Sequence, residues 1–199
     1  MSTLEVNKIT PVGVGTSVTL GDSGDTFTIP SGVTITNNGT QTGFGGTNTP
    51  SFYAQMNGTN QTGMSPNTNT KVQFATEIYD TDSAYDTSNY RFTVPSGKAG
   101  KYFIGSNINF GSSTQGRSSY ICIYKNGGQI QQFGQFFWTN YGSNPNVIEG
   151  TQDYTVSAMA ILDLSAGDYI EIFGRRYDGT SIYFRGNTGN NFFGYKLIL

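Results

Sequence analysis

The residues best suited to bind a ligand lie in the segment FFWTNYGSNPNVIEGTQDY, residues 136–154. Trp138 and Tyr141 offer aromatic faces, and neighbouring asparagines offer amide donors and acceptors, which together suit a sugar or a glycolipid headgroup. The candidate ligand-binding residues here are Trp138, Asn140, Tyr141 and Asn144. A structural interpretation fits them equally, with Trp138 packed between subunits and the asparagines forming turns.

A second candidate for ligand binding is the pair Arg175 and Arg176 in FGRRYDGT. Guanidinium groups recognise carboxylates and phosphates, so this pair can be expected to reach an acidic group on a glycan. The solvated end of a hairpin explains the same two residues.

Three carboxylates, Asp80, Asp82 and Asp86, lie close together in DTDSAYD. Carboxylate oxygens are the ligands that calcium prefers, but the segment is not an EF-hand, because Tyr85 stands where that loop requires glycine. Both a calcium site and a purely structural role remain open for this segment.

Residues for catalysis are scarce. The chain has no histidine, the usual general base and the commonest metal ligand. Glu149 and Asp153 could meet the spacing of a glycosidase pair, about 5–9.5 Å, yet nothing in their context distinguishes them from solvated carboxylates. Alternation in YICIYK places Cys122 in a strand as a buried thiol. We therefore expect a protein that is not an enzyme and needs no cofactor.

Charge and hydropathy narrow the choice of partners. The net charge is −2, from 11 basic and 13 acidic residues without a basic run, so we expect neither nucleic acid nor an anionic membrane as a partner. No segment approaches the ~20 apolar residues of a membrane span, and the N-terminus does not resemble an export signal. The single cysteine excludes an intrachain disulfide.

The composition divides the chain into a thin first part and an aromatic-rich second part. All 13 tyrosines and the single tryptophan follow residue 51, and glycine and proline punctuate the junction. We therefore predict an N-terminal anchor and stalk over residues 1–46, a linker over 47–51 and a head over 52–199.

The stalk carries three short pairs of alternating apolar residues, separated by the turns GDSGD and PSG. These predicted stalk-core residues are Val18, Leu20, Phe27, Ile29, Val33 and Ile35. Six apolar side chains cannot offset a backbone ordering cost of ~1–2 kcal/mol per residue in one chain. The pattern favours an intertwined oligomeric stalk in which other chains complete the core; a flexible linker is the alternative.

The head is predicted to be all-β, a sandwich or barrel, because short strands alternate with turns at regular spacing. Predicted strands span residues 52–56, 71–76, 89–94, 101–110, 118–126, 129–138, 154–164, 168–176, 181–186 and 192–199. Tight turns are predicted within residues 125–129, 165–169 and 177–181.

One series of residues in the head matches a known pattern: Phe74, Asp80, Tyr85, Phe92, Gly100 and Tyr102. It resembles the globular head of complement component-one q, a relative of the tumour necrosis factor jelly roll. The first three spacings fit that pattern, and the fourth is two residues longer. Further matches are Gly167 with Asp168, and the closing strand through Phe192 or Phe193 and Gly194. The resemblance implies a jelly-roll sandwich and a homotrimer whose strands bury aromatic residues along a threefold axis.

The segment TSVTLGDSGDTFTIPSGVTITNNGT is similar to N-terminal segments of virion proteins from tailed bacteriophages of marine and cyanobacterial hosts. This similarity implies a trimeric virion fibre or spike, made in the bacterial cytoplasm and attached to other virion proteins through its N-terminus. The head would bind the host surface, with a glycan as the expected ligand. A capsid decoration or structural fibre without a receptor role is the alternative.

Overall fold

The computed structural model describes residues 9, 17–36, 38, 48–111, 119–134, 154–177 and 181–198. The chain divides into two compact units, Met1–Phe44 and Gly45–Leu199.

In the N-terminal unit the predicted turns form, but the predicted strands do not. Backbone hydrogen bonds close turns from Asp25 N–H to the Asp22 carbonyl (3.0 Å) and from Val33 N–H to the Pro30 carbonyl (3.2 Å). Residues 17–36 contain no strand in the single chain. Ile29 is half-buried, whereas the other stalk-core side chains are exposed: Val18, Leu20, Phe27, Val33 and Ile35. The predicted strands depend on other chains to complete their core, so they remain a prediction for the oligomer.

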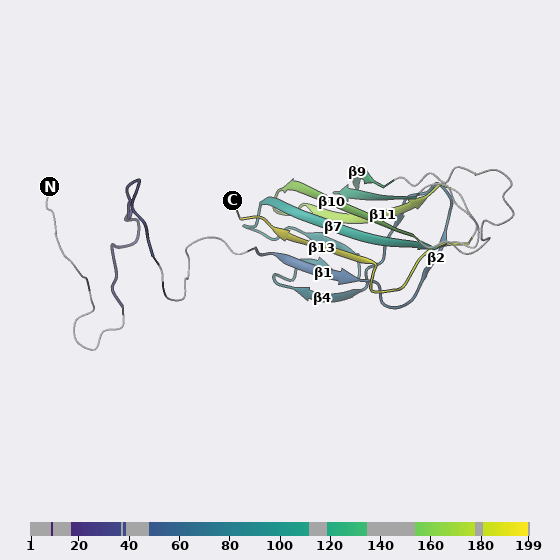
Figure 1. The fold of residues 1–199 in the computed structure, drawn as a ribbon, viewed down its shortest axis with the longest axis horizontal. Coiled ribbons are helices and arrows are strands. Elements are labelled where there is room, and N and C mark those ends of the chain that lie inside the picture. Colours follow the sequence, from purple (N-terminus) through teal and green to yellow (C-terminus); the bar gives the residue numbers. More distant parts are fainter. Residues whose placement is uncertain are drawn as a thin grey trace. The chain divides into compact units, whose positions relative to one another are not determined.

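The C-terminal unit consists of two antiparallel sheets. The described residues place seven strands in sheet A, in the order β2-β12-β7-β13-β1-β4, with β10 paired to the other side of β7. These strands are β1 (Ser51–Gln55), β2 (Gln61–Met64), β4 (Thr76–Asp80), β7 (Gly100–Gly111), β10 (Tyr154–Leu164), β12 (Ile182–Phe184) and β13 (Asn191–Lys196). Figure 1 shows β4, β1, β13, β7 and β10 running side by side.

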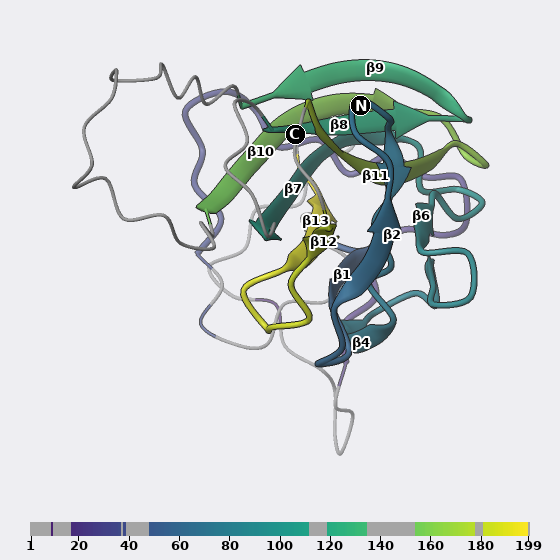
Figure 2. The same cartoon turned by 90° about the vertical axis from the view of Figure 1, so that its right-hand side faces the viewer.

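Sheet B holds six strands within the described ranges, in the order β5-β6-β11-β8-β9, with β3 also paired to β11. These strands are β3 (Thr70–Lys71), β5 (Tyr85–Asp86), β6 (Arg91–Thr93), β8 (Ser119–Lys125), β9 (Gly128–Phe133) and β11 (Tyr169–Arg176). Viewed along the strands, sheet B lies across from sheet A (Figure 2). The predicted all-β sandwich is therefore confirmed.

Aromatic rings fill the space between the sheets. The ring of Phe52 stacks on those of Tyr85 and Phe92, with centroids 5.4 and 4.7 Å away, and meets Phe192 edge-on at 4.8 Å. Such offset and edge-to-face pairs add to the free energy gained by burying apolar area. The inner face of each sheet therefore packs into the core.

The matched pattern residues lie at the centre of this packing. Phe74, Phe92 and Tyr102 are fully buried, and Tyr85 is 6% exposed. The Tyr85 hydroxyl donates to the Phe74 carbonyl (2.9 Å), and Asp80 accepts from the Tyr85 N–H (2.6 Å). The pattern thus describes an aromatic core and the loop that holds it.

The longer spacing before Gly100 forms a turn. The Lys98 N–H donates to the Pro95 carbonyl at 3.1 Å, and Gly97 takes a φ of 73°, which favours glycine. The Lys98 ammonium also pairs with Asp82 at 3.3 Å. The two additional residues are therefore accommodated in an ordered turn outside the core.

The predicted strand over residues 71–76 is wrong as a single element. Residues 72–75 form no strand; β3 before them belongs to sheet B and β4 after them to sheet A. Val72 and Phe74 are buried where the chain crosses between the two sheets. Their alternation therefore comes from burial, although residues 72–75 are not part of a strand. Sequence reasoning also missed β2, a short polar strand with a glycine.

Two of the predicted hairpin turns form as expected. Asn126 and Gly127 take φ values of 53° and 80° between β8 and β9, which only small turn residues adopt readily. In the turn before β11, the Asp168 N–H donates to the Ser165 carbonyl (3.1 Å), and Gly167 has a φ of 86°. The strand predicted over 129–138 ends at Phe133, and residues 135–138 and 178–180 lie outside the described residues.

The head has two ends, which we define by the strands that meet there. At one end, the Lys196 N–H donates to the Pro50 carbonyl (3.0 Å) and the Leu197 N–H to the Lys101 carbonyl (2.8 Å). We call this the base. At the other end, which we call the far end, β7 finishes and β10 begins, because Phe110 pairs with Tyr154.

No helix in the described ranges is long and apolar enough to cross a membrane.

Candidate assembly face and ligand-binding residues

The outer face of sheet A carries an unusual set of aromatic side chains. Alternation along β13 sends Phe192 into the core and leaves Phe193 and Tyr195 on the outside, where they are half-buried. Phe103 on β7 pairs with Tyr195, and Tyr53 on β1 pairs with Phe193. Aromatic residues therefore meet across three neighbouring strands.

These side chains form a continuous row of rings, which we call the aromatic strip: Tyr79, Tyr53, Phe193, Phe103 and Tyr195. Successive ring centroids lie 6.3, 6.2, 6.2 and 5.4 Å apart in that order. Cross-strand aromatic pairs of this kind stabilise a sheet. Within the described residues these rings keep part of their surface accessible: Tyr79 is 49% exposed, and the other four are half-buried.

Gly105 on β7 sets how the strip lies on the sheet. A Cβ at this position would lie 2.4 Å from the ring of Phe193, which is too close for two non-bonded carbon atoms. The ring therefore lies directly over the glycine backbone. Glycine here lowers the surface so that Phe193 can continue the strip between Tyr53 and Phe103.

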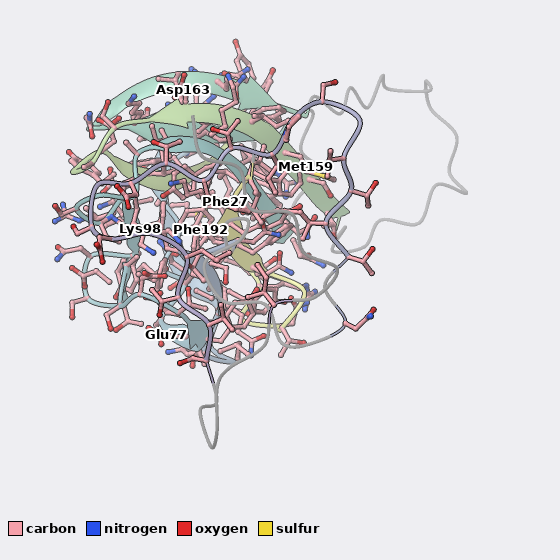
Figure 3. All side chains as sticks on the ribbon, turned by 90° about the vertical axis from the view of Figure 1, so that its left-hand side faces the viewer. Phe27, Glu77, Lys98, Met159, Asp163 and Phe192 are labelled. Carbon is pink, nitrogen blue, oxygen red and sulfur yellow. The ribbon has the colours of Figure 1, made fainter. Side chains whose placement is uncertain are left out.

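Both borders of the outer face are apolar as well. On β10, Met159 and Ile161 are 57% and 63% exposed; on β4, Ile78 and Tyr79 are 52% and 49% exposed. Figure 3 shows Met159 and Glu77, from these two border strands, on opposite sides of the core residue Phe192. The exposed apolar surface thus extends from one border of the sheet to the other.

Towards the far end the outer face becomes polar. The Ser157 hydroxyl donates to the Asn107 side-chain oxygen (2.6 Å), and the Asn107 amide donates to the Asn191 side-chain oxygen (3.0 Å). This row crosses β10, β7 and β13 one pleat beyond Gly105, so the aromatic strip ends there.

The outer face of sheet B has a different chemistry, because it carries charged side chains that contact partners within the sheet. Glu171, only 6% exposed, accepts from Lys71 at 2.5 Å. The guanidinium of Arg91 lies 4.7 Å from the Tyr169 ring centre, and that of Arg175 lies 4.8 Å from the Tyr120 ring centre. Charged side chains with partners thus mark the outer face of sheet B, whereas exposed apolar side chains mark that of sheet A.

The predicted arginine pair is divided between two environments. Arg175 lies half-buried on the outer face of sheet B, where it donates to Gln132 at 3.2 Å. Arg176, the next residue, points the other way and is 1% exposed. Arg176 is therefore not solvated, as the hairpin-end interpretation required, and its burial separates it from Arg175.

The other predicted ligand-binding residues, Trp138, Asn140, Tyr141 and Asn144, lie outside the described residues. Glu149 and Asp153 lie outside them as well. Of the flanking strands, β9 stops at Phe133 and β10 starts at Tyr154, whose partner is Phe110 at the far end.

The three neighbouring aspartates do not converge on a common point. Asp80 accepts from backbone N–H groups of its own loop, Asp82 pairs with Lys98, and Asp86 accepts from the N–H groups of Ser88 and Asn89. The Asn89 hydrogen bonds lower the pKa of Asp86 below its ordinary value. No cluster of metal-ligating side chains occurs among the residues that the structure describes. The structural interpretation of this segment fits these contacts.

A further carboxyl group, that of Asp168, has a pKa lowered to about 2. The Lys125 ammonium at 2.7 Å and the Asn126 amide at 2.7 Å stabilise its charged form, and so does the Ser165 N–H. These contacts join the β8–β9 turn to the turn before β11. Asp168 is thus part of a structural clamp at the base.

Cys122 is fully buried on β8, and burial raises the pKa of its thiol. This placement agrees with the expected structural role, since the reactive form of cysteine is the thiolate.

Sequence reasoning did not identify the aromatic strip. The sequence NFFGYK indicates this strip, because alternation places Phe193 and Tyr195 on the face opposite to Phe192. A strand with aromatic residues on both faces indicates that both faces are to be covered.

The fold has known counterparts among solved structures. The globular domain of zebrafish complement 1qA protein matches with a TM-score of 0.51 and 17% identity, over 74% of this chain and 96% of that one. The tumour necrosis factor Eiger of S. frugiperda matches with a TM-score of 0.51 and 13% identity, over 74% and 91%. The head therefore has a jelly-roll fold like those of complement component-one q and tumour necrosis factor. No family model matches the chain, and no curated protein matches it significantly.

Proposed function

We propose that this chain forms a homotrimer that serves as a fibre or spike of a tailed-bacteriophage virion, with the head presented to the host surface. The observation that carries the proposal is the uncovered aromatic strip together with the apolar borders of sheet A. Burying apolar area yields about 25 cal/mol per Å², so a second layer over this face is strongly favoured.

The positions of the two borders favour a ring. Contact between the β10 border of one copy and the β4 border of the next uses two different surfaces, and repetition of such a contact gives a cyclic assembly when the rotation between copies closes. The complement component-one q heads that the sequence resembles are trimers, which sets the expected number at three. The paired charges of sheet B would then face outwards.

The N-terminal unit fits the same assembly. Five of its six predicted core side chains are exposed in the single chain, Phe27 by 67%. Three parallel copies would supply apolar partners for one another, as stacked repeats do. The N-terminus would attach to other virion proteins, in line with its similarity to phage virion segments.

The host-binding role rests on the far end of the head. The chain enters the head at the base, so the far end is the part of the head most distant from that entry point. We expect the segment with Trp138, Asn140, Tyr141 and Asn144, which precedes the start of β10 at the far end, to bind a surface glycan. Three equivalent sites on one rigid head, and several heads on one particle, would convert weak binding into avidity.

Electron microscopy of the native particle that contains this chain tests the proposal. A threefold knob at the tail, with the N-terminus docked on the virion, is the expected result. A position on the capsid lattice would instead favour a decoration protein without a receptor role. Particles with Trp138→Ala and Tyr141→Ala should adsorb less; unchanged adsorption by intact particles would contradict the ligand assignment.

A further inference from the structure

One methionine of this chain lies on the surface that the proposed assembly would cover. The sequence has four methionines, of which the structure describes three. Met56 and Met64 belong to the core and are 3% and 8% exposed, whereas Met159 on β10 (Figure 3) is 57% exposed. Among the described residues, Met159 is therefore the thioether that a solute in the surrounding water can reach.

Met159 occupies a boundary on the outer face of sheet A. It pairs with Gly105, which in turn pairs with Phe193, so these three residues form one row across β10, β7 and β13. The next outer residue of β10 towards the base is Ile161, which is 63% exposed. The next one towards the far end is Ser157, which belongs to the polar row. Met159 is thus the last apolar residue of β10 before the outer face becomes polar.

A thioether differs from the other apolar side chains of this border in its chemistry, because a peroxide oxidises it. The sulfur lone pair attacks one oxygen of hydrogen peroxide, the S–O bond forms as the O–O bond breaks, and the second oxygen leaves as water with both peroxide protons. The sulfur loses two electrons and the peroxide gains them. The product, methionine sulfoxide, carries a polar hydrogen-bond acceptor where the thioether was apolar.

The neighbours of Met159 on this face are poorly suited to such an acceptor. Its cross-strand partner Gly105 and the next outer residue Ile161 have no side-chain N–H or O–H group. The Ser157 hydroxyl already donates to Asn107. Water can satisfy a sulfoxide on the single chain, but another copy packed on this border would exclude that water. A sulfoxide buried without a donor opposes association.

We propose that Met159 is an oxidation site coupled to assembly: peroxide oxidises it in the free chain, the trimer covers it, and the sulfoxide form does not assemble. The inference rests on the proposed function, because it requires the trimer. Since oxidation and assembly use the same surface, each opposes the other. Methionine sulfoxide reductase, with a thiol as the reductant, restores the apolar side chain.

The other sulfur groups that the structure describes are shielded from this reaction. Met56 and Met64 are buried in the core, and the thiol of Cys122 is fully buried. Burial also raises the pKa of that thiol, which disfavours the reactive thiolate. Within the described part of the head, peroxide is therefore expected to modify Met159 first.

The test is a brief exposure of the full-length protein to hydrogen peroxide at a series of protein concentrations, followed by peptide mass spectrometry and light scattering. We expect Met159 to be oxidised at least about fivefold more slowly in the trimer than in the dissociated chain. The concentration that gives half of this protection should coincide with the midpoint of assembly. Met56 and Met64 are internal controls, since their slow oxidation should not follow that midpoint.

Met159→Gln places a polar amide of similar length at this position and stands in for the sulfoxide. It should raise the concentration for half-dissociation at least about tenfold. Met159→Leu is the matched control, because leucine is apolar and resists peroxide, and this variant should assemble normally with or without the oxidant. The side chain is exposed in the single chain, so both variants are expected to fold, which circular dichroism checks.

The failure of this inference differs from the failure of the proposed function. Equal oxidation rates of Met159 in the trimer and in the dissociated chain would overturn the inference and leave the trimer unaffected. Normal assembly of the sulfoxide form would do the same, and so would a loss of assembly that methionine sulfoxide reductase does not reverse. A chain that stays monomeric without any peroxide would overturn the proposed assembly, and this inference with it.

Discussion

At the scale of single residues, Gly105 links the local sequence to the proposed assembly. Replacing it with alanine would place a Cβ 2.4 Å from the Phe193 ring, which would have to leave the strip. We expect Gly105→Ala to lower the free energy of unfolding by about 1–3 kcal/mol and to weaken self-association. Chemical denaturation and sedimentation measure the two effects.

Gly128→Ala is the matched control for that substitution, because a Cβ at Gly128 meets its nearest atom, the Lys125 carbonyl, at an ordinary 3.6 Å. This variant should behave like the wild type. If Gly105→Ala behaves in the same way, the role assigned to Gly105 is refuted.

Asp168 predicts a specific dependence of stability on pH. Its pKa in the folded protein is about 2, below the ordinary value near 3.9, so its contribution to stability is fully present above about pH 4, declines below that and is lost as the pH falls through 2. Asp168→Asn should therefore cost about 1 kcal/mol at pH 7 and only a small fraction of that at pH 2. Thermal unfolding across this pH range measures the difference.

Asp163→Asn provides the comparison for that series, since Asp163 is an exposed residue at the base. A cost of Asp168→Asn that stays constant from pH 7 to pH 2 would contradict the clamp between the two turns.

At the scale of strands, β10 is predicted to be an interface element. Ile161→Lys places an ammonium in the apolar border, and we expect the concentration for half-dissociation to rise at least about tenfold. Ile130→Lys on β9 is the control, because Ile130 is an exposed isoleucine (43%) on a border strand of sheet B. Analytical ultracentrifugation of both variants decides: equal dissociation would show that sheet A is not the interface.

The strands also show what the sequence could and could not reveal. Periodicity found the long strands β7, β8, β10 and β11, because alternating burial produces a period of two in the residues themselves. It failed at residues 72–75, where Val72 and Phe74 alternate because the chain crosses the core between sheets. Burial patterns alone do not record which sheet a residue joins.

The candidate sites were less accessible to sequence reasoning. The pattern residues Phe74, Tyr85 and Phe92 led to the core, whereas the hydrogen bond from the Gly186 N–H to Asn60 joins residues 126 positions apart in the chain. Nothing local to either residue indicates that they meet. The arginine pair failed for a simpler reason: neighbours in a strand point to opposite faces, so Arg175 and Arg176 could not act together.

At the scale of the whole molecule, the stalk is predicted to become ordered only in the assembly. Backbone amides of residues 17–36 should exchange slowly with deuterium in the full-length trimer, because apolar partners from other chains would bury Phe27. Phe27→Asp should abolish this protection in the stalk and leave protection of the head strands unchanged. Rapid exchange of residues 17–36 in the wild-type trimer would favour the flexible-linker alternative.

The central claim is that other copies of the chain cover the apolar outer face of sheet A. The most direct test is the mass of the full-length protein in solution at micromolar concentration, measured by light scattering or native mass spectrometry. Our account predicts three times the chain mass of 21.5 kDa. A mass of a single chain that persists at these concentrations would contradict the aromatic strip as an interface and, with it, the trimeric fibre.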